Sequence, residues 1–124
     1  MIEYTVKVYP DGTKYWLLND KYHREDGPAV EYFNGSKYWY INDKLHRERA
    51  PAIECANGTK HYYLNGKRHR EDGAAIEYAN GNKSWWLNGE RVTEEEHKRR
   101  TSRVKELTVQ EISDLLGYEV KVVK

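Results

Sequence analysis

Short runs rich in aromatic and aliphatic residues recur along most of the chain, and tight-turn pairs of polar residues and glycine separate them. In KYWLL at residues 14–18 and KSWWL at 83–87, aromatic and aliphatic side chains follow a basic start. Runs of roughly four to six residues rich in Tyr, Trp, Val and Ile favour β-strands. Asn-Gly and Asp-Gly pairs between such runs are the strongest short signal of a β-hairpin, because a type I′ turn needs two consecutive residues with positive φ.

The turn pairs are evenly spaced, which makes the chain a tandem repeat with a 23-residue period. Aligned columns hold a lysine, an aromatic, an aliphatic and later a His-Arg pair, and a second turn such as Asn19-Asp20 follows the aliphatic column. Two strands per unit predict a mainly β, single-layer antiparallel meander of about eight strands. The turn pairs and the main columns are Asp11-Gly12, Asn34-Gly35, Asn57-Gly58 and Asn80-Gly81; Lys14, Lys37, Lys60 and Lys83; Trp16, Trp39, Tyr62 and Trp85; Leu18, Ile41, Leu64 and Leu87; His23, His46 and His69; and Arg24, Arg47 and Arg70.

The repeat pattern divides the chain into two parts. The first is a β-hairpin array over residues 1–92, and the second is a C-terminal segment over residues 93–124. The array comprises a half-repeat 1–10, repeats 11–33, 34–56 and 57–79, and a partial repeat 80–92.

Strand register can be predicted from the turns. If Asn34-Gly35 is a two-residue loop, Phe33 opposes Ser36, Tyr32 opposes Lys37 and Val30 opposes Trp39. The same counting from the other turns predicts further cross-strand pairs. They are Ile53 with Tyr62, Ile76 with Trp85, His23 with Trp16, Arg24 with Tyr15 and Lys7 with Trp16. Alternation then predicts two faces. The expected core face carries the Trp, Leu/Ile and His columns with Val30, Ile53, Ile76 and Lys7. The expected solvated face carries Tyr15, Tyr38, His61, Leu17, Tyr40, Tyr63, Trp86, Ala29, Ala52, Ala75, Glu31, Glu54, Glu77 and the Arg column.

The C-terminal segment has helix signals. Thr93 to Glu96 and Thr108 to Glu111 both read as capping boxes. An apolar stripe of Ile112, Leu115 and Leu116 precedes a stop at Gly117, and alternation in Tyr118, Val120 and Val122 predicts a last strand. A short helical cap and final strand are therefore expected to cover the end of the sheet, with dimerisation through the apolar stripe as the alternative.

The amino-acid composition bears on the expected partners and cellular compartment of the protein. The chain has 21 Lys plus Arg against 20 Asp plus Glu, so net charge gives no general attraction to nucleic acid or anionic membranes. The single cysteine suits a reducing compartment, and we expect neither a signal peptide nor an apolar membrane span. We expect a cytoplasmic protein, in the host cytoplasm if the chain is viral.

The segment NGTKHYYLNGKRHR carries the pattern Tyr-x-x-Asn-Gly-Lys-x-His and resembles the MORN repeat and its variants. The resemblance covers about residues 11–92 and departs from the usual pattern where Arg follows His. It implies an elongated single-layer sheet that serves as a scaffold for partner proteins and sometimes for anionic lipid. The HREDGPA variant with its C-terminal tail also resembles small proteins encoded by tailed phages and large DNA viruses, which implies an accessory role directed at a host protein.

The sequence gives little support for a catalytic site or a metal site. Equivalent histidines in successive units should lie two strands apart, about 9–10 Å, which is too far to share one zinc ion. Cys55 occupies the column of Tyr32 and Tyr78 and is interpreted as a space-filling residue, with no unique base to activate it. No metal, cofactor or enzymatic activity is therefore expected.

The expected function is binding of a protein partner, with inhibition of a host or defence complex expected if the chain is viral. Tyr, Trp and Arg are enriched at binding hot spots. The alternative is binding of single-stranded nucleic acid or anionic lipid through the same residues, and purely structural pairing is a third interpretation. The candidate partner-binding residues are Tyr15, Arg24, Tyr38, Tyr40, Arg47, Tyr63, Arg70 and Trp86.

Overall fold

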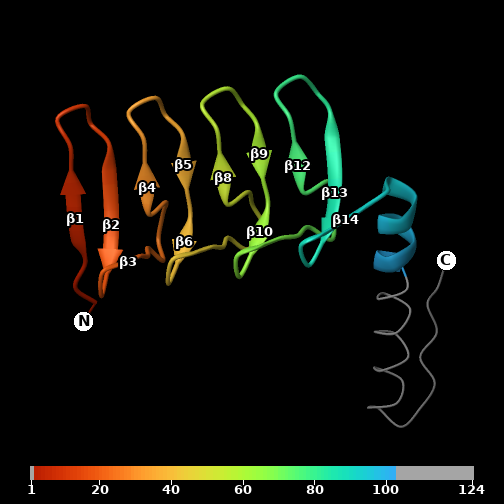
Figure 1. Ribbon diagram of the computed structural model, residues 1–124, viewed down its shortest axis with the longest axis horizontal. Helices are drawn as coiled ribbons and strands as arrows, with labels where there is room; N and C mark the ends of the chain where they lie inside the picture. The colour runs from red at the N-terminus through yellow and green to blue at the C-terminus, as the bar shows by residue number, and fades with distance from the viewer. Residues whose placement is uncertain (1, 103–124) are drawn as a thin grey trace, which may run out of the picture.

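The computed structural model describes residues 2–102, and within them the chain forms a row of β-hairpins followed by a helix (Figure 1). Ten of the described strands belong to one antiparallel sheet, whose main order is β1-β2-β4-β5-β8-β9-β12-β13-β14, with β3 paired to β2. This confirms the predicted mainly β meander of repeated hairpins. The strands are β1 (Thr5–Val8), β2 (Lys14–Leu18), β3 (Lys21–Tyr22), β4 (Val30–Glu31), β5 (Lys37–Tyr38), β6 (Tyr40–Ile41), β7 (Lys44–Leu45), β8 (Ile53–Glu54), β9 (Lys60–His61), β10 (Tyr63–Leu64), β11 (Lys67–Arg68), β12 (Ile76–Glu77), β13 (Lys83–Leu87) and β14 (Glu90–Val92).

Each unit has three parts, which Figure 1 shows in succession. An upper hairpin, such as β4–β5, contributes two strands to the long sheet. A lower hairpin, such as β6–β7, continues from it and turns back on itself. A crossover segment then carries the chain up to the next upper hairpin. The crossover segments are residues 23–29, 46–52 and 69–75.

The lower hairpins turn as the sequence predicts. Asn19 and Asp20 have φ of 52° and 62°, and Asn65 and Gly66 have φ of 50° and 80°. Two consecutive positive φ values are the mark of a type I′ turn. The predicted pairing across this turn is also confirmed, because the His23 N–H donates to the Trp16 carbonyl at 3.1 Å.

The upper hairpins turn differently from the prediction. The Tyr32 N–H donates to the Ser36 carbonyl at 2.9 Å, and the Gly35 N–H donates to the Tyr32 carbonyl at 3.0 Å. The loop therefore has three residues, a type I turn that ends in Gly35 with φ of 95°. The Asn34 carboxamide supports it by accepting a hydrogen bond from the Ser36 N–H at 3.0 Å.

This extra loop residue shifts the register by one and corrects the predicted pairs. Val30 lies opposite Tyr38 rather than Trp39, and Lys37 lies opposite Glu31 rather than Tyr32. The other upper hairpins shift in the same way, so the predicted pairings of Phe33, Ile53, Ile76 and Lys7 are also wrong. Ile53 pairs with His61, Ile76 with Ser84, and Lys7 with Tyr15.

Because a one-residue slip moves a strand's side chains to the opposite face, the predicted faces must be redrawn. One face, which we call the tyrosine face, carries Lys7, Tyr15, Val30, Tyr38, Ile53, His61, Ile76 and Ser84 in one row. The other, which we call the tryptophan face, carries Trp16, Trp39, Tyr62 and Trp85. The two-residue loop had placed Val30, Ile53, Ile76 and Lys7 on the same face as the Trp column. In the structure these four residues lie on the opposite face.

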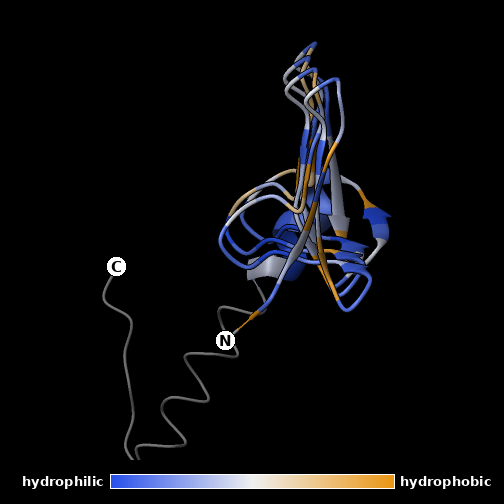
Figure 2. Ribbon diagram, turned by 90° about the vertical axis from the view of Figure 1, so that its left-hand side faces the viewer, coloured by the Kyte–Doolittle hydropathy of each residue, from blue (hydrophilic) through white to orange (hydrophobic). Residues whose placement is uncertain are grey.

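The buried residues are small and lie where the crossover segments meet the strands. Ala29, Ala52, Ala75 and the neighbouring Val30, Ile53 and Ile76 are buried, whereas the Trp column is only half-buried. In Figure 2 the upper hairpins overlie one another as a thin layer, and the chain widens only at the level of the lower hairpins and crossovers. The expected tryptophan core is thus a half-covered surface of a thin sheet.

The histidine column ties each unit to the next. The His23 ring Nδ1 accepts a hydrogen bond from the Asn42 N–H at 3.0 Å, and the same bond joins His46 to Asn65 and His69 to Asn88. Each donor is a backbone N–H of the lower turn in the following unit. These three bonds hold adjacent lower hairpins together.

A hydroxyl column makes the equivalent tie at the upper loops. Thr13 Oγ1 accepts from the Phe33 N–H at 3.1 Å, and Ser36 Oγ accepts from the Ala56 N–H at 2.9 Å. Thr59 Oγ1 accepts from the Ala79 N–H at 3.1 Å, and all three hydroxyl residues are buried. Every unit is therefore fastened to its neighbour at both ends of its hairpins.

A helix begins at Glu94 and follows β14 at the end of the row. Thr93 Oγ1 accepts from the Glu96 N–H at 3.1 Å, which confirms Thr93 as the N-cap. His97 is buried, and its Nε2 lies 2.6 Å from the Arg70 carbonyl oxygen of the last crossover segment. The second capping box, the apolar stripe of residues 112–116, the stop at Gly117 and the last strand lie outside the described residues.

Candidate functional site

Six tyrosines gather on the tyrosine face of the first two units. Neighbouring rings have centroids 5.1–6.5 Å apart, and most pairs meet edge to face, the favoured arrangement for aromatic rings. All except Tyr9 close a continuous ring of contacts that runs from Tyr15 through Tyr22, Tyr40, Tyr38 and Tyr32 back to Tyr15. We call this set the tyrosine cluster: Tyr9, Tyr15, Tyr22, Tyr32, Tyr38 and Tyr40.

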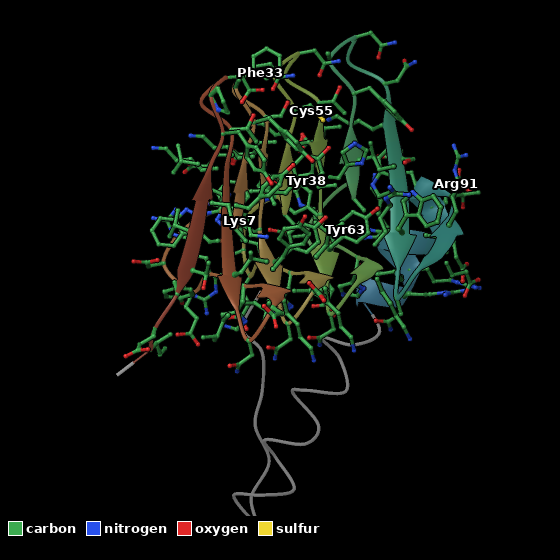
Figure 3. The ribbon with its side chains drawn as sticks, turned by 60° about the vertical axis from the view of Figure 1, so that its left-hand side comes forward. Lys7, Phe33, Tyr38, Cys55, Tyr63 and Arg91 are labelled. Atoms are coloured by element: carbon green, nitrogen blue, oxygen red, sulfur yellow. The ribbon has the colours of Figure 1, made fainter. Side chains whose placement is uncertain are left out.

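The register of the sheet assembles the tyrosine cluster. Tyr15 and Tyr38 flank Val30 from the two strands that pair with β4. Tyr22 and Tyr40 come from adjacent lower hairpins, where the Asp43 N–H donates to the Tyr22 carbonyl at 2.9 Å. Figure 3 shows Lys7, Tyr38 and Tyr63 in succession across the sheet, with Phe33 at the tip of an upper loop.

Four phenols of the tyrosine cluster, Tyr15, Tyr22, Tyr32 and Tyr40, have a raised pKa. Burial, followed by the neighbouring phenols Tyr32 and Tyr9, raises the pKa of Tyr15 above its ordinary value. Burial is also the first cause that raises the pKa of Tyr22, Tyr32 and Tyr40. The cluster is therefore an uncharged aromatic surface whose hydroxyl groups can donate and accept hydrogen bonds.

The upper edge of the tyrosine cluster is open to solvent. Tyr9 is 43% exposed, Tyr32 38% and Phe33 69%. A shallow groove runs between the first two upper loops and is lined by Tyr9, Pro10, Asp11, Thr13, Tyr15, Tyr32 and Phe33. Contiguous exposed aromatic surface of this kind is typical of an interaction site.

The tyrosine face changes character in the last two units. Arg68 lies between Tyr63 and Trp86, with its guanidinium carbon 5.0 Å and 4.9 Å from the two ring centroids. One Arg68 nitrogen donates to the Tyr63 hydroxyl at 2.6 Å and lies 3.5 Å from His61 Nδ1. Burial, followed by the charge of Arg68, lowers the pKa of His61. The face therefore runs from an uncharged tyrosine cluster to a cation held between aromatic rings.

The predicted site residues divide between the two faces. Tyr15, Tyr38, Tyr40, Tyr63 and Trp86 share the tyrosine face, as expected. The predicted pairing of Arg24 with Tyr15 is wrong, and the Arg24, Arg47 and Arg70 column stacks on the tryptophan face instead. The guanidinium carbons lie 3.8 Å, 3.8 Å and 4.0 Å from the centroids of Trp16, Trp39 and Tyr62.

The arginine column is engaged within the protein. Arg70 donates to Asp72 at 2.9 Å, to the Ala74 carbonyl at 3.1 Å and to Glu77 at 2.8 Å. Burial acts to lower the pKa of Arg70, but the hydrogen bonds to the two carboxylates outweigh it and the net shift is upward. Arg24 and Arg47 make related contacts, so the column fastens each crossover segment to the sheet.

Cys55 and the column histidines are the remaining side chains considered for catalysis or metal binding. Burial raises the pKa of the Cys55 thiol, which disfavours the nucleophilic thiolate. In the described part of the chain, no three His, Cys, Asp or Glu side chains converge as a metal site would require. The column histidines instead direct Nδ1 to backbone N–H groups.

Sequence reasoning missed four members of the exposed aromatic surface: Tyr9, Tyr22, Tyr32 and Phe33. The first three belong to the tyrosine cluster through the three-residue loops and the contacts between lower hairpins. One sequence signal could have found them. Asp or Asn two residues before Thr or Ser, as in Asp11–Thr13 and Asn34–Ser36, is typical of a side-chain-supported turn, and it marks the longer loop.

No protein-family model matches this chain, and no curated protein matches it. Within the residues that the structure describes, the one helix is too short and too polar to cross a lipid bilayer.

Proposed function

We propose that the protein is a non-catalytic binding module that docks a partner protein on its tyrosine face. The observation that carries this proposal is the tyrosine cluster, in which six uncharged rings lie in contact at one end of the sheet with an exposed edge at Tyr9 and Tyr32. Tyrosine supplies large contact area with little conformational entropy to lose, and it is enriched at binding hot spots.

The distribution of charge favours a protein over a nucleic acid or an anionic lipid. Binding of phosphates needs basic side chains that are free to reach them. Arg24 and Arg70 are each paired with a carboxylate of their own crossover segment and one of the following strand, and Arg47 is paired with Glu54 of the following strand. The net charge of +1 adds no further attraction.

The MORN-like pattern of the repeat agrees with this proposal, because such arrays act as scaffolds for partner proteins. Its resemblance to small phage and viral proteins favours a host protein as the partner. The proposed action is then steric: the sheet covers a surface of a host or defence complex and inhibits it without chemistry.

The test compares two surface variants of the full chain in affinity capture from a host lysate. Tyr32→Ser/Phe33→Ser alters exposed positions at the edge of the tyrosine cluster. Lys37→Ser/Lys60→Ser alters two exposed positions on the tryptophan face and serves as the matched control. We expect one stoichiometric protein with the wild type and the control, and its loss with the tyrosine-face variant.

Both variants must retain the wild-type circular dichroism spectrum for the comparison to count. Capture that survives Tyr32→Ser/Phe33→Ser but fails in the lysine variant would contradict the assignment to the tyrosine face. Binding of single-stranded DNA, RNA or anionic vesicles that weakens steeply with salt would replace the proposal by the nucleic-acid or lipid alternative.

A further inference from the structure

The first strand leaves one edge of the long sheet open. Within residues 2–102, β1 pairs with β2 alone, whereas β14 and the helix follow the opposite end of the row (Figure 1). All four residues of β1 are exposed. Val6 and Val8 of β1 are 40% and 63% exposed, and Ile2, which precedes the strand, is 50% exposed, so large apolar side chains are concentrated along this edge.

The hydrogen bonds of β1 show which backbone groups face the open edge. The Tyr9 N–H donates to the Thr13 carbonyl of the neighbouring strand segment at 2.9 Å. Alternate residues of an antiparallel strand face the same partner, so Lys7 and Thr5 also turn their peptide groups toward β2. Val6, Val8 and Tyr4 then turn theirs outward.

The partner of Val6 supports this assignment. Val6 lies opposite Trp16, whose N–H donates away from β1, to the Ala29 carbonyl, at 2.7 Å. Val6 and Trp16 are thus a non-hydrogen-bonded pair, and the donor and acceptor of Val6 are available for another strand.

The sequence of this edge is complementary to itself when it is read in the opposite direction. Centred on Thr5, the segment IEYTVKV at residues 2–8 sets Ile2 against Val8, Glu3 against Lys7 and Tyr4 against Val6. An antiparallel neighbour in this register places apolar side chains opposite each other on the tryptophan face. On the tyrosine face it places an acid opposite a base twice, a pairing that stabilises adjacent strands.

We propose that two copies of this chain pair through their β1 edges, antiparallel about a two-fold axis at Thr5. The register fits the backbone, because the residues with outward peptide groups, Tyr4 and Val6, lie opposite each other and can exchange both hydrogen bonds. A shift by two residues in either direction removes the Glu3–Lys7 pairs, and the register centred on Lys7 sets two lysines against each other.

This arrangement closes on itself and extends the surface of the protein. The interface is isologous, so each β1 edge is used up by the other copy and no open-ended array follows. A two-fold axis perpendicular to the sheet keeps the tyrosine faces of both copies on the same side. The dimer therefore presents two tyrosine clusters on one side, with the two paired β1 strands between their Tyr15 residues on β2.

The first test is a charge swap, read by light scattering and sedimentation of the full chain. The wild type is expected to show twice the mass of one chain and to dissociate on dilution. Lys7→Glu or Glu3→Lys alone is expected to weaken the dimer by about ten-fold or more, because each places like charges opposite each other twice. Glu3→Lys/Lys7→Glu restores the pairs and is expected to restore the dimer, while Lys21→Glu is the matched control.

A cross-link provides a second readout. In the proposed register the two Thr5 residues form a non-hydrogen-bonded pair with Cα atoms about 4.5 Å apart, within the range of a disulfide. In a Cys55→Ser background, Thr5→Cys should oxidise to a covalent dimer and Lys21→Cys should not. A single-chain mass at all concentrations, or equal dimerisation of Lys7→Glu and the double swap, would overturn the proposal. Either result leaves the test of partner binding by Tyr32→Ser/Phe33→Ser unaffected.

Discussion

At the scale of single residues, the methyl group of Ala50 explains why the crossover segment of the second full unit, residues 46–52, differs from those of the first and third units. A Cβ atom added at Gly27 or Gly73 would lie 2.9 Å from the guanidinium carbon of the arginine in the same segment. The second unit carries Ala50 at this place, and the preceding Arg49 adopts a φ of 64°. The alanine side chain cannot occupy the space below the arginine, so the loop takes another path through a left-handed residue.

Restoring the sequence of the other units should therefore stabilise the fold. Arg49→Asp/Ala50→Gly removes a left-handed non-glycine residue, which costs about 1–2 kcal/mol, and supplies the carboxylate that Arg24 and Arg70 already use. We expect the free energy of unfolding, measured by chemical denaturation, to rise by about 1 kcal/mol. The converse change Gly73→Ala should lower it, and a stable Gly73→Ala variant would refute the steric argument.

His61 gives the tyrosine face a dependence on pH. Its pKa in the folded protein is lowered, by burial first and by Arg68 second, from the ordinary value of 6.5. The unfolded chain therefore binds this proton more readily, and the contribution to stability is present above pH 6.5 and is lost as the pH falls toward the folded pKa.

His61→Tyr should remove that loss, because tyrosine stays neutral and already occupies this column at Tyr15 and Tyr38. Between pH 7 and pH 5 we expect the melting temperature of the wild type to fall more than that of the variant, as measured by thermal denaturation at each pH. Parallel curves for the two proteins would show that His61 titrates alike in the folded and unfolded states.

At the scale of the hairpin, the sequence predicted one turn of each unit and missed the other. The Asn-Asp and Asn-Gly turns of the lower hairpins depend on two residues with positive φ, which is a local property that the sequence displays. At the upper loops an Asn-Gly pair is compatible with a two-residue or a three-residue loop. The choice rests on the Asn34 carboxamide and on the tie from Ser36 to the next unit, a contact between residues 20 positions apart.

The extra residue in each upper loop limited how much of the candidate site could be predicted from the sequence. The aromatic positions Tyr15, Tyr38 and Tyr40 were assigned to one face correctly, because strict alternation relates them along a strand. The arginine column was assigned to the wrong face, since each arginine leaves its strand in the crossover segment and returns over an indole or phenol ring. Alternation carries no information about a side chain outside the strand.

The hydroxyl column offers a test of coupling between upper loops. Thr59→Val keeps the shape of the side chain but leaves the Ala79 N–H without its acceptor. We expect a loss of about 1–2 kcal/mol in the free energy of unfolding and faster hydrogen exchange of the Ala79 amide. Asn82→Thr, in the same column of the last unit, is the control and should change stability by less than about 0.5 kcal/mol. An unchanged Ala79 exchange rate in Thr59→Val would rule out the tie.

At the scale of the whole molecule, the fold is one-dimensional. Among residues 2–102, each unit pairs with its neighbours through the histidine tie below, the hydroxyl tie above and the strand pairing between them. No large side chain among residues 2–102 is fully buried, so there is no central core in which a distant contact could form. Variation between units therefore changes the surface without disturbing the sheet, which is how a tyrosine cluster and an arginine–aromatic stack can share one face.

The row of hairpins also has a mechanical consequence. The strands lie across the long axis, so tension applied between residues 2 and 102 loads the bonds of the outermost hairpin before those of the next (Figure 1). Such a sheet should peel rather than shear. In an optical trap we expect low-force rips that each release one unit of 23 residues, about 80 Å of extended chain, and a single rip of the entire array would contradict this. The protein would then yield gradually, with the units that remain still folded.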